Sequence, residues 1–254
     1  MGSIRDNNED FVLVCNEAVG PLDNLYIVSD GMGGHNAGEI ASKKAIEYFV
    51  EYIKSHNETH AIMFGEDQEA GSWLVVLMQM AATYANQNVY AISRQDASLD
   101  GMGATFTALS IKHGRAYVVH MGDSRAYLVA GEKITQLTTD HTYVNDLLRA
   151  EIISDEQART HHLRNVITRA MGSEELCEVD RLSVSVEDGD IFVLCSDGLT
   201  NMIGDDEIYK IVSEAISSDL EGGTLDKAVA SLVEAANNNG GDDNISVILI
   251  GGGL

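Results

Sequence analysis

The stretch Leu25-Tyr26-Ile27-Val28-Ser29-Asp30-Gly31 is a short apolar run that ends in a carboxylate and a glycine. Such runs, rich in Val, Ile and Leu and stopped by Gly, are typical of buried strands. The same pattern returns far along the chain as Ile191-Phe192-Val193-Leu194-Cys195-Ser196-Asp197-Gly198. An aspartate at the exit of a buried strand is costly unless a partner compensates its charge. We therefore expect the carboxylates of Asp30 and Asp197 to meet at one cation, as in a metal-dependent enzyme.

Outward from these two runs, hydrophobic periodicity predicts groups of strands and pairs of helices. Strands are expected at 9–16, 24–30, 104–111, 115–121, 125–130, 133–137, 164–169, 180–186, 191–196 and 244–250. Helices are expected at 37–55, 69–93, 205–217 and 224–237, with a mostly helical stretch at 141–162. The four strands between 104 and 137 are separated by short turns, which predicts an antiparallel meander. Paired helices between runs of strands indicate the α+β class rather than βαβ alternation.

The composition is that of an ordinary globular chain. Its 254 residues are 44% hydrophobic and 22% charged, and no internal repeat or low-complexity linker divides them. We therefore predict one domain over residues 1–254. In the helix expected at 69–93, Met78 and Met80 fall on the stripe that we assign to the core.

Charge and cysteine content restrict the partners and the compartment. The formal net charge of -24 opposes binding to nucleic acid or to anionic lipid surfaces, and it suits the binding of cations. No run of 18 apolar residues is present, so we expect no membrane span, and the N-terminus lacks the apolar core of a signal peptide. Cys15, Cys177 and Cys195 form no Cys-x-x-Cys pair, which favours a reducing compartment. We expect a cytoplasmic monomer.

Five acidic sites, most of them beside glycine, lie at predicted strand ends or turns. They are Arg5-Asp6-Asn7-Asn8-Glu9-Asp10, Asp30-Gly31-Met32-Gly33-Gly34-His35, Gly122-Asp123-Ser124-Arg125, Ser196-Asp197-Gly198 and Gly241-Asp242-Asp243-Asn244. Hard divalent cations such as Mg²⁺ and Mn²⁺ prefer carboxylate, carbonyl and water oxygens. Any one site could be an Asx turn, but five together favour a metal centre.

In their order and spacing these sites resemble the metal-dependent protein Ser/Thr phosphatases of the protein phosphatase 2C type, in particular the bacterial members. The matching segments are Arg5-x-x-Asn8-Glu9-Asp10, Ser29 to Ser42, Met102-Gly103-Ala104-Thr105, His120 to Tyr127, Thr139-Asp140-His141-Thr142, Arg164 to Gly172, Leu194 to Thr200 and Gly241-x-Asp243-Asn244-Ile245-Ser246-Val247. They run from residue 5 to residue 247, so the resemblance covers essentially the whole chain.

The resemblance implies a fold of four layers. Two packed antiparallel sheets would form a β-sandwich, flanked by pairs of antiparallel helices, with the metals at one end. Residues 142–163 correspond to the flap of the family. With neighbouring Arg164, this region holds Arg149, Arg159, His161 and His162, the most basic stretch of an acidic chain. It could meet a phosphorylated substrate segment, and a solvated helix with chance cations is the alternative.

The resemblance also implies the ligands of two core ions, Mn²⁺ or Mg²⁺. Asp30 would bridge both ions, and the carbonyl of Gly31 would assist one of them. Asp197 and Asp243 would complete the other. The two ions, about 3.5–4 Å apart, would share a water, lower its pKa and give a hydroxide that attacks phosphorus in line. No covalent enzyme intermediate is needed, and no cysteine has the Cys-x5-Arg spacing of a cysteine phosphatase.

Further residues would surround these ions. By the resemblance, Glu9 and Asp10 would hold metal-bound waters, and Asp123 would join Asp197 at a third, weaker ion. Arg5 would clamp the substrate phosphate, because its planar donor fork matches phosphate oxygens and stays charged.

The proton donor to the leaving oxygen is less defined. Eukaryotic members carry His two positions after the bridging aspartate, where this chain has Met32. His35 is the nearby candidate, while a turn histidine or a metal-bound water are the alternatives. We expect His141 to hydrogen-bond a neighbouring loop. Family members usually have another strand before the Arg5 segment, whose loss would expose a sheet edge.

The function expected from these residues is hydrolysis of phosphoserine and phosphothreonine in proteins. The partners would be phosphorylated proteins, the substrates of a cognate Ser/Thr kinase. The alternative is a non-catalytic pseudophosphatase that binds phosphoproteins. A Ca²⁺-binding scaffold is disfavoured because the spaced acidic loop of an EF-hand is missing.

Overall fold

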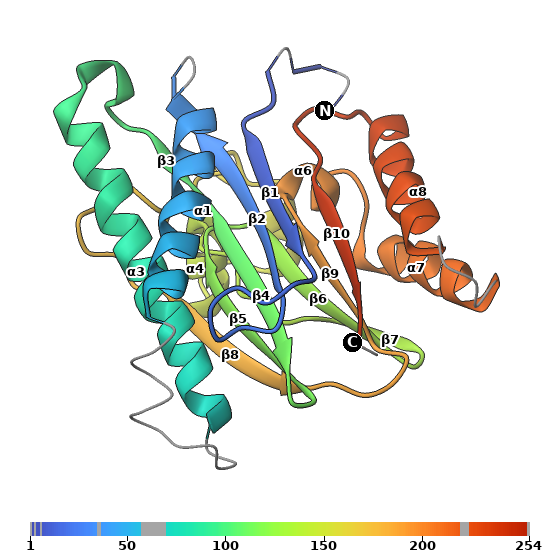
Figure 1. The fold of residues 1–254 in the computed structure, drawn as a ribbon. Coiled ribbons are helices and arrows are strands. Elements are labelled where there is room, and N and C mark those ends of the chain that lie inside the picture. Colours follow the sequence, from blue (N-terminus) through green and yellow to red (C-terminus); the bar gives the residue numbers. More distant parts are fainter. Residues whose placement is uncertain are drawn as a thin grey trace.

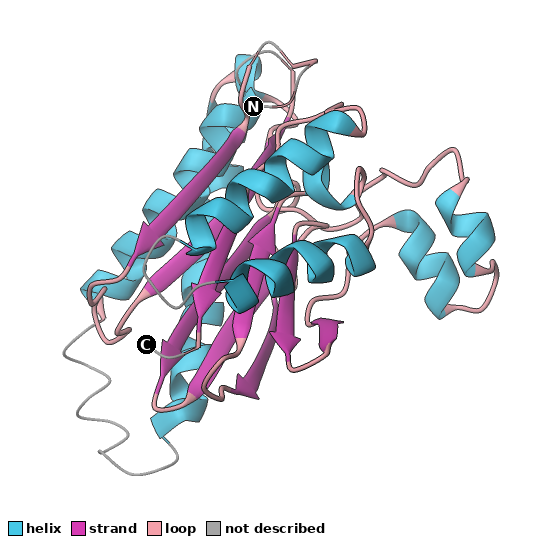
Figure 2. Cartoon of the chain, turned by 90° about the vertical axis from the view of Figure 1, so that its right-hand side faces the viewer, coloured by secondary structure: helices cyan, strands magenta, loops and turns pink. Residues whose placement is uncertain are grey.

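The computed structural model describes residues 2, 4, 5, 7–34, 37–56, 70–218 and 224–252. Two antiparallel sheets are stacked face to face, and helices cover both outer faces (Figures 1 and 2). The first sheet has six strands: β1 (Asp10–Cys15), β2 (Leu25–Met32), β4 (Phe106–Lys112), β5 (Arg115–Met121) and β8 (Asp180–Ser185) in that order, with β3 (Gly103–Ala104) paired to the end of β2. The second sheet has four strands: β10 (Val247–Gly251), β9 (Ile191–Cys195), β6 (Arg125–Ala130) and β7 (Lys133–Gln136).

Two pairs of long helices complete the four layers. Helices α1 (Ala37–Ser55) and α3 (Ala70–Gln95) lie on the first sheet, and α7 (Asp205–Ser218) and α8 (Thr224–Asn238) lie on the second (Figure 1). Shorter helices are η1 (Ala97–Leu99), α4 (Tyr143–Arg149), α5 (Asp155–Arg159) and α6 (Asp197–Thr200). The α+β class and the sandwich with flanking helix pairs are confirmed.

Three apolar layers hold the sandwich together. Between α1, α3 and the first sheet, the rings of Phe49 and Phe106 lie 5.0 Å apart, centroid to centroid. The layer between the two sheets includes Phe192, and the layer under α7 and α8 includes Leu232. Strands β4 and β5 are therefore buried on both faces, in agreement with the nearly unbroken burial of their residues. Among the described helices, none combines the length and apolarity needed to cross a lipid bilayer.

The strands predicted between 104 and 137 do not form one meander. Strand β5 pairs with β4 and β8, whereas β6 pairs with β7 and β9. The chain therefore crosses from one sheet to the other at the turn Gly122-Asp123-Ser124. Alternating hydrophobicity has the same period whichever strand is the neighbour, so it could not reveal this crossing. The turn that changes sheets is also the one that carries a predicted metal ligand.

Two further expectations were wrong. Residues 164–169 form no strand: Ile167 makes an isolated bridge to Thr142, and Val166 is 44% exposed. Most of this segment is exposed, so pairing it into a sheet would bury little apolar surface. Met80 is 46% exposed on the outer face of α3, while Met78 is fully buried as predicted. Among the described strands, β1 pairs with β2 alone, and its Val14 is 57% exposed, so β1 lies at an edge of the first sheet.

Candidate active site

Asp30 and Asp197 lie at the same end of the sandwich. In the register of β1 and β2, Asp10 stands opposite Asp30. The carboxylate of Asp10 accepts a hydrogen bond of 2.8 Å from the hydroxyl of Ser196, the residue directly before Asp197. One buried side chain of the first sheet thus touches the exit of β9 in the second sheet. The two matched strand exits converge, as the sequence predicts.

Asp123 reaches this end through the turn between β5 and β6. Gly122 has a φ of 109°, which L-residues with a side chain rarely adopt. A Cβ at Gly122 would lie 2.7 Å from the side chain of Thr105, so the position has no space for a larger residue. The glycine therefore allows a tight sheet-to-sheet crossing that leaves Asp123 buried, with 7% of its surface exposed.

Asp243 is placed by the loop that enters β10. The neighbouring Asn244 accepts a hydrogen bond of 2.8 Å from the backbone N–H of Glu9 and donates one of 2.9 Å to the carbonyl of Asn7. Asn244 thereby fastens the N-terminal segment to the C-terminal one. Glu9 and Asp243 come from opposite ends of the chain and meet at one site for this reason.

The carbonyl of Gly31 and the carboxylate of Glu9 both lie close to the backbone of Gly38. A Cβ added to Gly38 would lie 2.8 Å from the Gly31 oxygen and 2.8 Å from Glu9 Oε1. The N-terminus of α1 can therefore approach the end of β2 closely only because residue 38 is glycine. The approach brings together two of the oxygen atoms that the sequence assigns to the metal centre.

The five aspartates of the site influence one another electrostatically. Burial, followed by the charges of Asp10, Asp197, Asp123 and Asp243, holds the pKa of Asp30 well above its ordinary value. Burial and then the charge of Asp197 raise the pKa of Asp123 to about 8. Burial and the charge of Asp243 raise the pKa of Asp197 to about 6. Without a cation, this cluster of like charges is unfavourable.

Three oxygens of these carboxylates have no hydrogen-bond partner among the residues that the structure describes. They are Asp10 Oδ1, Asp123 Oδ1 and Asp197 Oδ1, all inaccessible to water. Buried carboxylate oxygens without partners are costly, and an all-oxygen donor set is the one that hard divalent cations prefer. The residues therefore fit a divalent metal centre. As the side chains stand in the described part of the chain, no group of three or more His, Cys, Asp or Glu residues is placed to hold a metal ion.

Arg5 contacts the site through Asp243. Its Nη2 lies 2.8 Å from Asp243 Oδ2, and 51% of the Arg5 side chain is exposed. The charges of Asp243, Glu9 and Asp30 all raise the pKa of the Arg5 guanidinium, so this cation borders the whole cluster. The structure pairs the predicted phosphate-binding residue with a predicted metal ligand.

Thr105 is a residue of the site to which sequence reasoning assigned no role. Its hydroxyl accepts a hydrogen bond of 2.9 Å from the backbone N–H of Asp30 and lies 2.6 Å from the hydroxyl of Ser124. It therefore links the end of β2 to the turn that carries Asp123. The Met102-to-Thr105 segment was recognised as a motif, but the partners of the hydroxyl depend on which strands meet.

His35, the predicted proton donor, lies outside the described residues. The basic stretch at 142–163 forms α4 and α5, whose first turns are capped by Thr142 and Ser154. Arg149 and Arg159 are exposed. They are thus available to solvent and to a binding partner.

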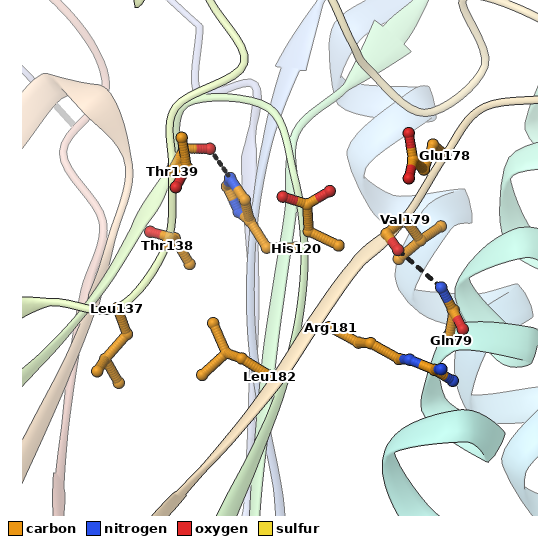
Figure 3. Close-up of a pocket in the computed structure, with 10 residues that line it drawn as sticks. Gln79, His120, Leu137, Thr138, Thr139, Glu178, Val179, Arg181 and Leu182 are labelled. Carbon is orange, nitrogen blue, oxygen red and sulfur yellow. Dashed lines mark hydrogen bonds between the residues drawn. The ribbon is translucent and has the colours of Figure 1, made fainter. Parts of the chain in front are cut away.

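A separate cavity of about 420 Å³ opens between β5, the start of β8 and the loop after β7 (Figure 3). His120, Thr139, Asp180 and Gln79 are among the residues that line it. None of the predicted site residues lies in its wall. The cavity is therefore distinct from the carboxylate cluster.

Comparison with known proteins gives one consistent result. Residues 5–235 match the protein phosphatase 2C family. The serine/threonine phosphatase Stp of Listeria monocytogenes is 36% identical over 251 residues, covering 98% of this chain and 92% of the relative. The crystal structure of the Mycobacterium tuberculosis serine/threonine phosphatase PstP superposes with a TM-score of 0.77 at 31% identity, covering 98% of this chain and 93% of that one. A structure of the PstP catalytic domain with two manganese ions gives a TM-score of 0.76 at 30% identity, with coverage of 98% and 93%.

Proposed function

The chain belongs to the protein phosphatase 2C family and is a metal-dependent protein serine/threonine phosphatase, and from this premise we propose which of its residues bind metal and phosphate. The metal ligands would be Glu9, Asp30, Gly31, Asp123, Asp197 and Asp243. The observation that carries this assignment is the group of buried carboxylates with three unpartnered oxygens. Role by role, Asp30 would bridge two core ions, and Asp123 with Asp197 would hold a weaker third.

We propose Mn²⁺ as the ion of the core site, because the similar PstP structure carries two manganese ions. Bound divalent ions supply Lewis-acid chemistry and positive charge at the phosphate. Asp10 would orient water beside them, since its carboxylate is buried and fixed by Ser196. Arg5 would bind and orient the phosphate, and the charged fork on an exposed segment suits this task. His35 would provide the proton that the leaving seryl or threonyl oxygen requires.

The remaining parts of the proposal concern the whole chain. We propose one phosphatase domain over residues 1–254, with 142–163 as a flap that meets the substrate through its exposed arginines. It would act as a monomer on proteins phosphorylated by a cognate kinase. All three cysteines are free thiols, which supports a reducing, cytoplasmic setting. A non-catalytic binding role is not favoured, because every carboxylate of the metal centre is present.

The test is hydrolysis of a phosphothreonine peptide with and without Mn²⁺, by the wild type and by Asp197→Ala. We expect turnover only with the ion, and a loss of at least about 100-fold in the variant. Asp188→Ala, in an exposed turn of the same acidic chain, is the control that should retain activity. Turnover in the presence of a chelator, or full activity of Asp197→Ala, would refute the assignment.

A further inference from the structure

Two buried histidines lie next to the carboxylate cluster without belonging to it. His120 on β5 is 1% exposed and His141, after β7, is 3% exposed. Their rings stack with centroids 4.9 Å apart. Burial lowers the pKa of both, that of His120 to about 3, so both rings are neutral at pH 7. Buried neutral imidazoles have one donor and one acceptor nitrogen each, and their partners identify which is which.

The partners of His141 fix its tautomer. Its Nδ1 accepts a hydrogen bond of 3.0 Å from the backbone N–H of Gly122, so the proton is on Nε2. Nε2 lies 3.2 Å from a carboxylate oxygen of Asp180 and donates to it. The other oxygen of Asp180 accepts from Arg169 at 2.8 Å. The ring of His141 is thus held between two partners: Nε2 donates to Asp180, and Nδ1 accepts from the backbone N–H of Gly122.

Gly122 is bound to His141 twice. Besides the N–H contact to the ring, the carbonyl of Gly122 accepts a hydrogen bond of 2.7 Å from the backbone N–H of His141. Both polar backbone atoms of the residue before Asp123 therefore depend on one partner. Gly122 has a backbone conformation that glycine adopts easily, but glycine adopts many other conformations just as easily. The turn therefore has little intrinsic preference for this shape.

His120 supports the same turn from its other end. Its Nε2 donates to the carbonyl of Thr139 at 3.2 Å, which leaves Nδ1 to accept from the hydroxyl of Thr107 at 2.9 Å. With its single proton directed at His120, that hydroxyl faces the carbonyl of Ser124 at 3.2 Å without donating to it. His120 and Asp180 are among the residues that line the cavity. In Figure 3, the dashed line between His120 and Thr139 marks their hydrogen bond. These contacts thus begin at His120 and Asp180, which border the cavity, and end at Gly122 and Ser124, the residues on either side of Asp123.

We propose that His141 is a positioning residue that sets the place of the Asp123 carboxylate through its two hydrogen bonds to Gly122. His120 and Asp180 orient the ring of His141 for this task. The expected consequence for metal binding rests on the proposed metal role of Asp123. The expected effect on the backbone of Gly122 does not depend on that role.

Hydrogen exchange of the Gly122 and Asp123 amides in the metal-free protein is the primary test. In His141→Leu, which keeps the volume but removes the acceptor, we expect exchange at Gly122 to be about tenfold faster. In His141→Asn, whose Oδ1 can replace Nδ1, we expect exchange close to that of the wild type. Asn24→Ala is the control: it also removes a buried acceptor of a backbone N–H, at Ile111, and should leave Gly122 unchanged. Unchanged exchange in His141→Leu would overturn the proposal.

Two further measurements separate this proposal from the proposed function. If His141→Leu does not fold, Asp180→Ala removes the half-exposed acceptor of the ring together with its ion pair to Arg169, and it should speed exchange at Gly122 by a few-fold. No change there would likewise overturn the proposal. Calorimetric Mn²⁺ titration of Asp123→Ala tests the metal role alone. A wild-type isotherm in that variant would refute the assignment of Asp123, whatever the exchange data show.

Discussion

Arg5 and Asp243, 238 positions apart, form an ion pair with 2.8 Å between Nη2 and Oδ2. Both side chains are partly exposed, at 51% and 36%, and exposed pairs contribute at most about 1 kcal/mol to stability. The main effect of the pair is therefore on the position of the Arg5 guanidinium. It keeps the guanidinium at the edge of the carboxylate cluster, where a phosphate group bound to the metals would lie.

The first prediction concerns Arg5→Ala. We expect KM for a phosphothreonine peptide to rise by roughly tenfold, because a charged donor to phosphate is lost, with a smaller effect on kcat. Arg5→Lys should recover part of the loss, since it keeps the charge and lacks the planar fork. Arg94→Ala removes a similarly exposed arginine from another ion pair and should change neither constant. An unchanged KM in Arg5→Ala would show that Arg5 does not bind the phosphate.

The second prediction is that Asp30→Asn abolishes activity but stabilises the metal-free protein. Asp30 is surrounded by four other carboxylates, so neutralising it removes repulsion. We expect the free energy of unfolding in chelator to increase by about 0.5–2 kcal/mol. Turnover should fall by more than about 100-fold, because the residue that we propose as a ligand of both core ions is lost.

Chemical denaturation with EDTA and calorimetric Mn²⁺ titration check both halves of this prediction. The control is Asp190→Asn, which changes a buried aspartate that accepts a hydrogen bond from the backbone N–H of Glu187 far from the cluster. It should lose stability and retain Mn²⁺ binding. A metal-free Asp30→Asn protein less stable than the wild type would mean that the repulsion is compensated by other contacts.

The third prediction is that the metal-free protein loses stability between pH 6.5 and pH 8.0. The folded state raises the pKa of Asp123 from 3.8 to about 8, so in this window the folded protein retains a proton that the unfolded chain has released. Stability then falls as pH rises, with a slope of at most about 1.4 kcal/mol per pH unit for one group. The lowered pKa values of His120 and His141 act mainly below their ordinary value of 6.5, and they oppose this slope only near pH 6.5.

Thermal unfolding in EDTA at the two pH values measures this slope. Asp123→Asn should reduce it, because no proton is retained at that position, and the raised pKa of Asp30 accounts for the slope that remains. Added Mn²⁺ should stabilise the wild type more at pH 8.0 than at pH 6.5, since the ion competes with the proton for the same oxygens. A metal-free protein equally stable at both pH values would contradict the raised pKa of Asp123.

Local sequence patterns were sufficient for the α+β class and for the strand exits, whereas the four layers were implied by the family resemblance. Asp30 and Asp197 come directly after apolar runs whose burial can be predicted from the local sequence. Helices such as α1 and α8 are predicted from the 3.6-residue period of their apolar positions. The crossing at Gly122 was missed because alternation does not specify which strand is the neighbour. The contacts of Thr105 and His141 join segments that meet only when the sheets are stacked. A hydrogen bond to a neighbouring loop was predicted for His141, and Gly122 is that partner.

The fourth prediction tests the bridge formed by Thr105, which is 1% exposed. Thr105→Val keeps the shape but leaves the N–H of Asp30 without its acceptor and the hydroxyl of Ser124 without its partner. We expect a loss of about 1–3 kcal/mol in stability and a fall in kcat of roughly tenfold, because the carboxylates on both sides of the bridge shift.

Thr105→Ser keeps the hydroxyl and should retain most of the activity, although it loses the methyl group that packs beside Gly122. Thr138→Val provides the matched comparison, because the buried hydroxyl of Thr138 also accepts from a backbone N–H, that of Ala126. It should lose a similar amount of stability with kcat unchanged. If Thr105→Val and Thr138→Val reduce kcat equally, the effect is one of general stability, and Thr105 has no specific role in holding Asp30 and the Asp123 turn together.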